Sequence, residues 1–324
     1  MADSNSNQST GSNTSRRTFM QVAGATGIAA LAGCTGGGGG DTTRLSWHAG
    51  GTGGTYFPLS NEFKTIVEEH SDFTLQVQST GASVENVGSL QSGDADFALI
   101  QNDVAYFAKN GEGIEAFEGN PVENLRGVAT LYPETITLVT LKSTGITEPA
   151  DLAGKTINTG DLGSGTQVNA VQILEAIGIT DYEEQNAGFS TAADQLRNGD
   201  IDAAFVVGGW PVGAISDLAA NNDIEIVSFT GDARQKVLDA APFYAEDTIP
   251  GGTYGGVSED RETVSVKAMI ATRAELEADT VEGVTAAIFD NTDQLEIKKN
   301  FISKETAQEG MSIDLHEGAA AYFG

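Results

Sequence analysis

The residues with the clearest chemical potential in this 324-residue sequence are glycines and hydroxyl residues gathered in short loops. The loop Gly50–Tyr56 reads GGTGGTY and precedes an apolar helical pattern. Free N–H groups at a helix start can bind a carboxylate or phosphate. No Lys-Ser/Thr pair follows, as a Walker A loop requires, and Tyr56 stands where a Rossmann pattern counted from Gly51 needs Gly. We interpret the loop as an anion-binding site. The alternative is a tight turn without a ligand.

Polar groups recur at further predicted loops. Gln101 and Asp103 follow a buried strand, where they can accept a hydrogen bond from an ammonium or amide of a ligand. Glu134 is a second candidate for an ammonium, or else a surface acid. Trp210 could close over the carbon chain of a ligand, or could be an ordinary core residue. The full set of candidate ligand-binding residues is Gly51, Thr52, Gly53, Gly54, Thr55, Tyr56, Ser79, Thr80, Gly81, Ser83, Gln101, Asp103, Glu134, Ser164, Gly165, Thr166, Gly209 and Trp210.

Catalytic and metal-binding patterns are weak. The three histidines are far apart in the sequence and form no metal-binding spacing. The segment Leu162–Gly165 does not supply Gly-x-Ser-x-Gly, and Asp94–Asp96 and Asp200–Asp202 lack the Gly and distal Glu of an EF-hand loop. His48, beside the glycine loop, is the one residue that could act as a base. We expect a binding protein with no cofactor and no metal, not an enzyme.

The net charge of the chain excludes two kinds of partner. The chain holds 17 Lys and Arg against 46 Asp and Glu, a formal net charge of −29. A nucleic-acid or anionic-membrane partner requires a basic surface, so both are excluded as electrostatic partners. Excess carboxylate keeps a protein hydrated in concentrated salt, which is typical of halophilic acidic proteins.

The N-terminal segment has the pattern of an export signal. Arg16 and Arg17 precede a short apolar run, as in a twin-arginine (Tat) export signal, and Leu31–Cys34 is similar to a lipobox. The run is too short for a spanning helix. We predict a signal over residues 1–33, lipidation of Cys34, the only Cys, and a Gly-rich tether over 34–43. The mature protein would then be anchored by lipid to the extracytoplasmic face of the cell membrane. The alternative is a disordered tail with a chance Arg pair.

The chain also repeats itself, which predicts two related halves. Three segments recur in order: Gly53–Thr55 as Ser164–Thr166, Gly81–Ser83 as Gly188–Ser190, and Leu90–Ala98 as Leu196–Ala204. Within each copy the pattern predicts an α/β unit in which helices begin after polar loops. Two such halves facing each other would enclose a cleft.

Individual elements follow from periodicity. Apolar stripes predict a helix through Leu59, Phe63, Ile66 and Val67 and another through Val168, Val171, Leu174 and Ile177. Ser83 is predicted as the N-cap of a short helix, and Gly93 and Gly199 as helix ends. Strands are expected over Thr74–Gln78, Phe97–Ile100, Ala203–Val207 and Thr263–Ile270. The helical tail after Ile270 is expected to return to the first lobe, which leaves two crossings between lobes and hence a hinge.

Taken together, several motifs resemble the TAXI family, the extracytoplasmic solute receptors of TRAP transporters. They are Gly50–Leu59, Ser79–Asn86, Gly93–Asp96, Gln101–Asp103, Leu131–Glu134, Gly163–Thr166, Gly251–Tyr254 and Leu315–Ala319. The resemblance, which runs from about Leu45 to Gly324, implies an α/β, two-lobed type II periplasmic-binding-protein-like fold with a hinge and an interlobe cleft. We place lobe I at 44–138 plus 256–324 and lobe II at 139–255.

The resemblance also implies a function. The receptor would capture a small carboxylate or amino acid, similar to glutamate or glutamine, and deliver it to the membrane subunits of an ion-gradient-driven TRAP permease. The ligand contacts carried over are Gly51–Tyr56, Ser79–Ser83, Gln101–Asp103, Ser164–Thr166 and Gly209–Trp210.

One departure and two alternatives remain. The other TRAP receptor family clamps the ligand carboxylate with an Arg, whereas no Arg lies in a candidate loop here. The alternatives are an ABC-type substrate-binding protein of the same fold and an enzyme on a two-lobed fold that would use Asp103, Glu134 or His48.

Overall fold

The structure is a computed structural model that describes residues 42–324. The predicted signal, Cys34 and all but the last two residues of the predicted tether lie outside the described residues. Among the described residues, no helix is both long and apolar enough to cross a membrane.

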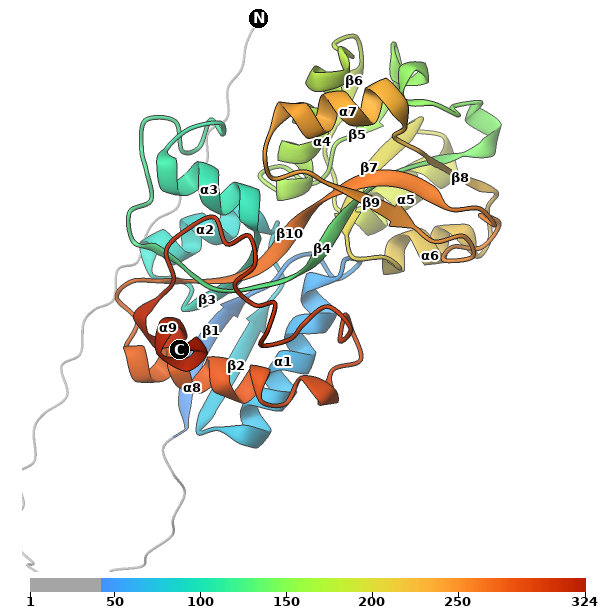
Figure 1. Cartoon of the computed structure of the whole chain (residues 1–324). Helices are drawn as coiled ribbons and strands as arrows, with labels where there is room; N and C mark the ends of the chain where they lie inside the picture. The colour runs from blue at the N-terminus through green and yellow to red at the C-terminus, as the bar shows by residue number, and fades with distance from the viewer. Residues whose placement is uncertain (1–41) are drawn as a thin grey trace, which may run out of the picture. The chain divides into compact units, whose positions relative to one another are not determined.

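Helices and strands alternate along most of the chain (Figure 1). The first half contains β1 (Thr43–His48), α1 (Tyr56–His70), β2 (Phe73–Gln78), α2 (Ser83–Ser92), β3 (Phe97–Gln101), α3 (Asn102–Asn110) and β4 (Leu125–Leu141). Next come β5 (Thr156–Asn158), α4 (Gly165–Ile177), β6 (Glu183–Gln185), α5 (Phe189–Asn198), β7 (Ala203–Gly208), α6 (Gly213–Ala219), β8 (Ile224–Val227) and α7 (Gly231–Ala240). The chain ends with β9 (Ala245–Ile249), β10 (Arg261–Arg273), α8 (Ala278–Phe289) and α9 (Glu317–Phe323).

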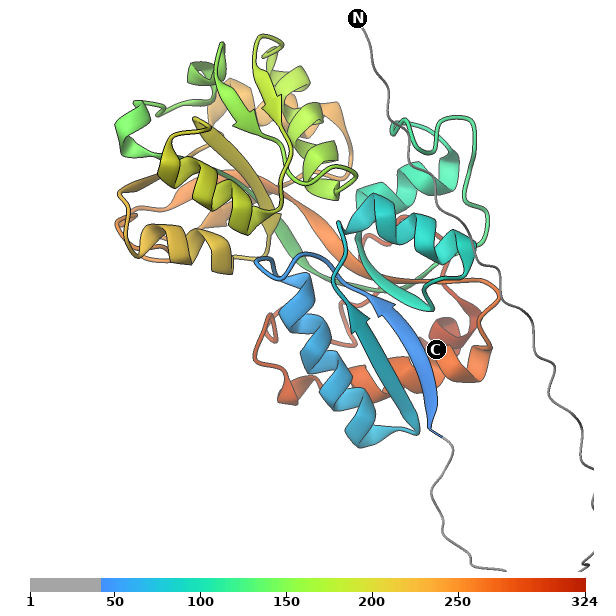
Figure 2. The ribbon, with the colours of Figure 1, turned by 180° about the vertical axis from the view of Figure 1, so that it is seen from behind.

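Two long antiparallel strands, β4 and β10, run through both lobes. The sheet order is β2-β1-β3-β10-β4-β7-β5-β6, with β8 paired to β4 and β9 to β10. One end of the β4–β10 pair carries the parallel strands β1, β2 and β3, and the other carries the parallel strands β5, β6 and β7. Figures 1 and 2 show one lobe at each end of this pair. The predicted two crossings between lobes are thus two strands.

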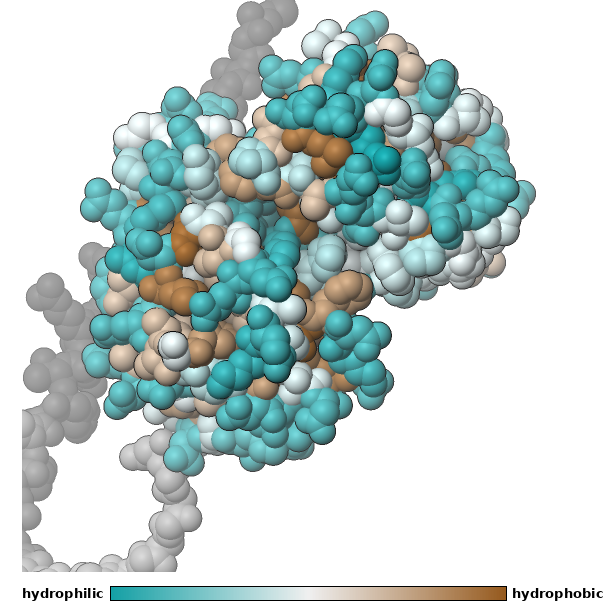
Figure 3. Space-filling view, viewed as in Figure 1, coloured by the Kyte–Doolittle hydropathy of each residue, from teal (hydrophilic) through white to brown (hydrophobic). Residues whose placement is uncertain are grey.

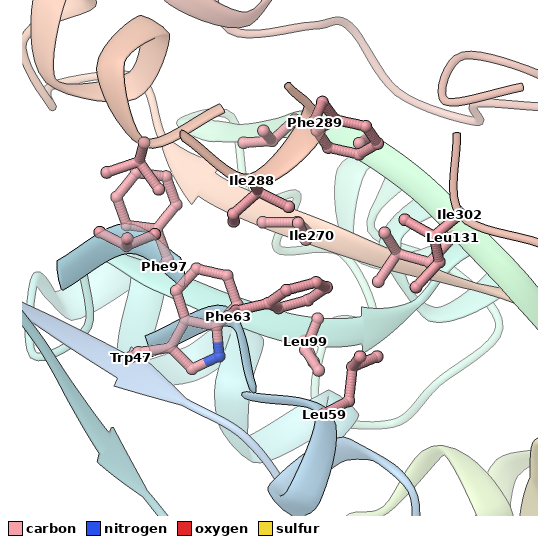
Figure 4. Packing of buried hydrophobic residues seen from close by; sticks show 14 of the residues in the cluster. Trp47, Leu59, Phe63, Phe97, Leu99, Leu131, Ile270, Ile288, Phe289 and Ile302 are labelled. Atoms are coloured by element: carbon pink, nitrogen blue, oxygen red, sulfur yellow. The ribbon is translucent and has the colours of Figure 1, made fainter. Parts of the chain in front are cut away.

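Each lobe has apolar packing on both faces of its part of the sheet. In the first lobe, Trp47 of β1 packs against Phe63 of α1 and Phe97 of β3, with ring centroids 5.8 and 5.6 Å away (Figure 4). The second face buries Val87, Leu90 and other residues of α2 and α3. Two further clusters cover the faces of the second lobe. On the surface seen in Figure 3, hydrophilic residues dominate and hydrophobic residues form separate patches, in keeping with the acidic composition.

The repeat is visible in the backbone. Gly93 and Gly199 end α2 and α5 with φ of 81° and 75°, as predicted for helix C-caps. Asp96 Oδ2 accepts a 2.8 Å hydrogen bond from the Ser46 N–H. At the corresponding place Asp202 Oδ2 accepts one of 2.9 Å from the Thr156 N–H. These aspartates therefore tie neighbouring strands together in both lobes.

Most predicted elements are confirmed, but two local predictions are wrong. Ser83 does not cap α2: Ala82 holds that place with φ 74°, and the Ser83 hydroxyl accepts a hydrogen bond from the Gln101 N–H at 3.1 Å. Helix α4 ends before Gly178 as expected, but Val171 of the predicted stripe is exposed. Its buried face contains Asn169 instead, whose amide donates to Asp103 of the other lobe and to the Tyr244 hydroxyl.

The tail returns to the first lobe, as predicted. Helix α8 packs on α1 and α9, and the His316 N–H donates to the Gly127 carbonyl at the start of β4. Figure 1 shows these C-terminal helices beside the N-terminal strands. The exact lobe boundaries stay a prediction, because β4 and β10 are continuous between the lobes.

Candidate functional site

A cavity of about 70 Å³ lies where the two lobes meet. The first lobe contributes Gly50, Gly51, Gly53, Gly54, Thr55, Tyr56, Thr80, Gly81, Ala82, Ser83, Gln101 and Glu134. The second contributes Asp161, Ser164, Gly165, Thr166, Gly188, Phe189 and Val207. A single water needs about 10–15 Å³ on this scale, so the cavity suits a small solute.

Four helices begin at the cavity, two from each lobe. These are α1 and α2 on one side and α4 and α5 on the other, and Figure 2 shows their starts gathered where the lobes face each other. A helix start carries unpaired N–H groups and a partial positive charge, which favour an anion. No Lys, Arg or His is among the lining residues. The partial positive charges at the helix starts therefore take the place of a cationic side chain in the cavity wall.

The lobes are in contact around the cavity. The Val84 N–H donates to the Gly163 carbonyl and the Ala214 N–H to the Gly53 carbonyl, each at 3.2 Å. Glycine permits this approach at Gly165, where a Cβ would overlap Gln101 Oε1. The structure thus represents a closed arrangement of the two lobes.

Several predicted hydroxyl groups build the loops rather than face open space. Ser79 donates to the Gly50 carbonyl at 3.0 Å, and Thr80 donates to Asn86 Oδ1 at 2.7 Å. Thr55 donates to the Gly209 carbonyl of the other lobe at 3.2 Å. These contacts hold the glycine loops and the lobes in place.

A buried polar cluster forms one wall of the cavity. Glu134 of β4 accepts hydrogen bonds from Gln101 Nε2 at 3.1 Å and from the Tyr132 hydroxyl at 3.0 Å. Burial raises the pKa of Glu134 to about 8, although these donors oppose the shift. The Tyr56 hydroxyl lies near Glu134 but has no hydrogen-bond partner among the described residues, and neither has Gln101 Oε1. Two buried polar atoms at the cavity wall are therefore left for a ligand to pair.

Asp103 has a different place from the one predicted. It does not line the cavity, and its Oδ2 accepts a 2.7 Å hydrogen bond from Asn169 Nδ2 of α4. Burial raises the pKa of Asp103 to about 6, while Asn169 and backbone N–H groups hold it down. Its position makes it a link between the lobes.

Four other candidates also lie outside the lining: Thr52, Ser79, Gly209 and Trp210. Trp210 is half-buried and packs on the second-lobe core, and its carbonyl accepts a hydrogen bond from Lys298 Nζ of the first lobe. Lys298 Nζ also lies 5.2 Å from the centre of the Trp210 ring. Burial lowers the pKa of Lys298 to about 8.

Thirteen of the predicted residues do line the cavity: Gly51, Gly53, Gly54, Thr55, Tyr56, Thr80, Gly81, Ser83, Gln101, Glu134, Ser164, Gly165 and Thr166. Gly50 and Ala82 also line it and belong to the predicted segments Gly50–Tyr56 and Ser79–Ser83, whereas the sequence interpretation missed Asp161, Gly188, Phe189 and Val207. The repeat already pointed to two of these, because Gly188 and Phe189 correspond to Gly81 and Ala82.

His48 is not among the lining residues either. Its ring is buried, burial lowers its pKa, and its Nδ1 has no hydrogen-bond partner among the described residues. It is therefore not placed to act on a molecule held in the cavity.

Comparison with known proteins places the chain in a family. A family model described as the NMT1-like family matches residues 48–324. The chain belongs to the NMT1-like family. The match begins in β1 and includes every lining residue of the cavity.

Solved structures show the same fold at low sequence identity. A protein of Bordetella bronchiseptica RB50 matches with a TM-score of 0.53 and 17% identity, over 87% of this chain and 80% of that chain. One described as a periplasmic transporter matches with a TM-score of 0.52 and 12% identity, over 79% and 87%. A Xanthomonas citri protein solved with ATP matches with a TM-score of 0.50 and 10% identity, over 86% and 98%. The predicted two-lobed, type II periplasmic-binding-protein-like fold is confirmed.

Proposed function

We propose that this protein is a solute receptor that captures one small molecule between its lobes and releases it chemically unchanged. The observation that carries the proposal is the cavity itself. It is walled by four helix starts from two lobes and by two buried polar atoms, Gln101 Oε1 and the Tyr56 hydroxyl, that have no partner among the described residues. Such a wall offers donors for an anion and uncompensated groups for a second polar group of the ligand.

The ligand we propose is a small carboxylate that also bears a hydrogen-bond donor, such as glutamate or glutamine. Its carboxylate would bind at the helix starts, because they supply N–H groups without any cationic side chain. Its ammonium or amide would bind near Gln101 and Glu134, which are acceptors. The ligand-binding residues are then the thirteen predicted residues that line the cavity.

The partner we propose is the membrane permease of a TRAP transporter, with the receptor tethered through a lipid on Cys34 at the extracytoplasmic face. The support is the resemblance of loops such as Gly50–Leu59 and Gly163–Thr166 to the TAXI family, together with the fold. Both kinds of support concern the receptor, and the permease would be recognised by the outer surfaces of the closed lobes.

A thermal-shift screen of the full chain tests the receptor function. Cys34→Ser would keep the protein free of lipid, and the screen would offer amino acids and dicarboxylates at high salt. A ligand present at one hundred times its Kd stabilises the protein by about 2.7 kcal/mol. We expect stabilisation by a small set of amino acids. No shift with any of them, together with turnover of some substrate, would favour an enzyme.

A further inference from the structure

The Glu134 carboxyl is buried at the cavity wall without a cation to neutralise it. Its side chain is only 3% exposed, and none of the ion pairs within the described part of the chain includes it. A buried carboxylate is stable only with a partner of opposite charge or with several hydrogen bonds, and otherwise it keeps its proton. The groups that hold its pKa down, the Gln101 amide and the Tyr132 and Tyr56 hydroxyls, are all neutral.

The surroundings of Glu134 oppose its ionisation more than they favour it. Asp103, a buried acid at the start of α3, raises its pKa further. The Tyr56 and Tyr132 hydroxyls stay protonated, because burial and the Glu134 charge raise their own pKa values. Lys298 is close enough for the Glu134 charge to raise its pKa, but its Nζ donates to the Trp210 carbonyl and forms no ion pair with Glu134.

The neighbouring strands and the opposite lobe bring no further cation to this wall. Val266 of β10 pairs with Glu134, and Gly208 of β7 pairs with the next residue, Thr135. Across the cavity the only charged lining residue is Asp161, which is negative. No cation within the described part of the chain forms an ion pair with Glu134, so a bound solute can supply that partner.

The Gln101 amide indicates where the positive charge of the solute would lie. Its Nε2 donates to Glu134, which leaves Oε1 as a buried acceptor with no partner, next to Gly165. An ammonium has three donors and no acceptor, so it could pair with Oε1 and with a free lone pair of Glu134 together.

We propose that Glu134 and Gln101 form the subsite for a cationic nitrogen of the solute, and that this nitrogen replaces the proton on Glu134 when the solute binds. This inference rests on the proposed receptor function and deepens it. The balanced step is a proton exchange. The Glu134 O–H bond breaks, its proton passes to the solvent, and the carboxylate that remains pairs with the ammonium. Capture of an amino acid thus releases about one proton per ligand.

Calorimetric titration of the full chain carrying Cys34→Ser with L-glutamate tests the exchange. At pH 7, titrations in two buffers of different ionisation enthalpy should report release of about 0.9 proton, given a pKa of about 8 for Glu134. The Kd should fall about tenfold between pH 6 and pH 7, since the proton competes with the ammonium. Glutarate, which has the same carbon chain without the ammonium, should release no proton and should bind much more weakly.

A variant and a matched control sharpen the result. Glu134→Gln keeps the size of the side chain and should abolish both the proton release and the pH dependence. Glu68→Gln makes the same change on the exposed face of α1 and should alter neither. Tight binding of L-glutamate by the unaltered Glu134 protein without proton release would overturn the proposal and leave the receptor function intact. Failure of every amino acid to bind would contradict the receptor function itself.

Discussion

Asn169 Nδ2 in α4 donates a 2.7 Å hydrogen bond to Asp103 Oδ2 at the start of α3, and this contact joins the two lobes beside the cavity. Both side chains are fully or almost fully buried. A buried hydrogen bond between an amide and a charged group contributes about 1.5–3 kcal/mol, more than a neutral pair. Closure of the lobes therefore depends on a polar contact that the ligand does not touch.

Asn169→Ala should weaken ligand binding by roughly 10–100-fold at pH 7.5, the equivalent of losing that contact in the closed form. The loss should shrink below pH 6, because Asp103, with a pKa of about 6, then carries a proton and no longer needs the donor. Titration calorimetry at pH 7.5 and pH 5 measures both effects. Asn61→Ala, on the exposed side of α1, is the control and should change neither value. An equal loss at the two pH values would contradict this role for Asp103.

Gly165→Ala should reduce ligand affinity at least tenfold, an estimate of about 1.4 kcal/mol or more. A Cβ at residue 165 would overlap Gln101 Oε1 and come within 2.8 Å of Ser83 Oγ, so the lobes could not close without moving the Gln101 amide. Gly88→Ala is the matched control, because a Cβ there meets nothing within 4 Å. Wild-type affinity in the Gly165→Ala protein would show that the lobes need not approach this closely.

Lys298→Met should lower ligand affinity about fivefold, equivalent to about 1 kcal/mol. The change removes the hydrogen bond to the Trp210 carbonyl and the contact with the Trp210 ring, both of which cross between lobes. X-ray scattering in solution should then show a larger open fraction without ligand. The neighbouring Lys299 is exposed, and Lys299→Met should leave both measurements unchanged. A closed fraction equal to that of the wild type would argue that Lys298 does not hold the lobes together.

Glu134 should make the ligand-free fold less stable as pH rises. Its pKa is about 8 in the folded protein against 4.5 as its ordinary value. Between these values the folded state holds a proton that the unfolded state has lost. Raising the pH through this window should therefore reduce the free energy of unfolding by about 1.4 kcal/mol per pH unit from this group. Urea unfolding of the wild type and Glu134→Gln at pH 5.5, 6.5 and 7.5 isolates the effect, and parallel curves for the two proteins would contradict it.

The sequence predicts most of the fold because its signals are local. Glycine at residues 93 and 199 ends two helices by a conformation that other residues rarely adopt, and apolar periodicity locates α1 and the buried strands. The buried face of α4 is different, since it contains Asn169, whose amide donates to Asp103 of the other lobe and to Tyr244 of its own. Periodicity alone therefore favoured Val171, which is exposed.

The site is predictable to the same extent. Loops at helix starts are found from glycine and hydroxyl residues, and these do line the cavity. Side chains that pair across the lobes are not found in this way, because nothing local distinguishes Asp103, which binds Asn169, from Glu134, which lines the cavity. Asp103 was predicted from its position after a strand and Glu134 as a candidate for an ammonium or a surface acid, and only the packing of the two lobes separates their roles.

The most direct measurement is a crystal structure of the protein grown with L-glutamate. The account expects one molecule enclosed between the lobes, with a carboxylate at the starts of the helices and its nitrogen within hydrogen-bond distance of Gln101 Oε1 and Glu134. A closed protein whose cavity holds only water, or a solute bound elsewhere on the surface, would contradict it.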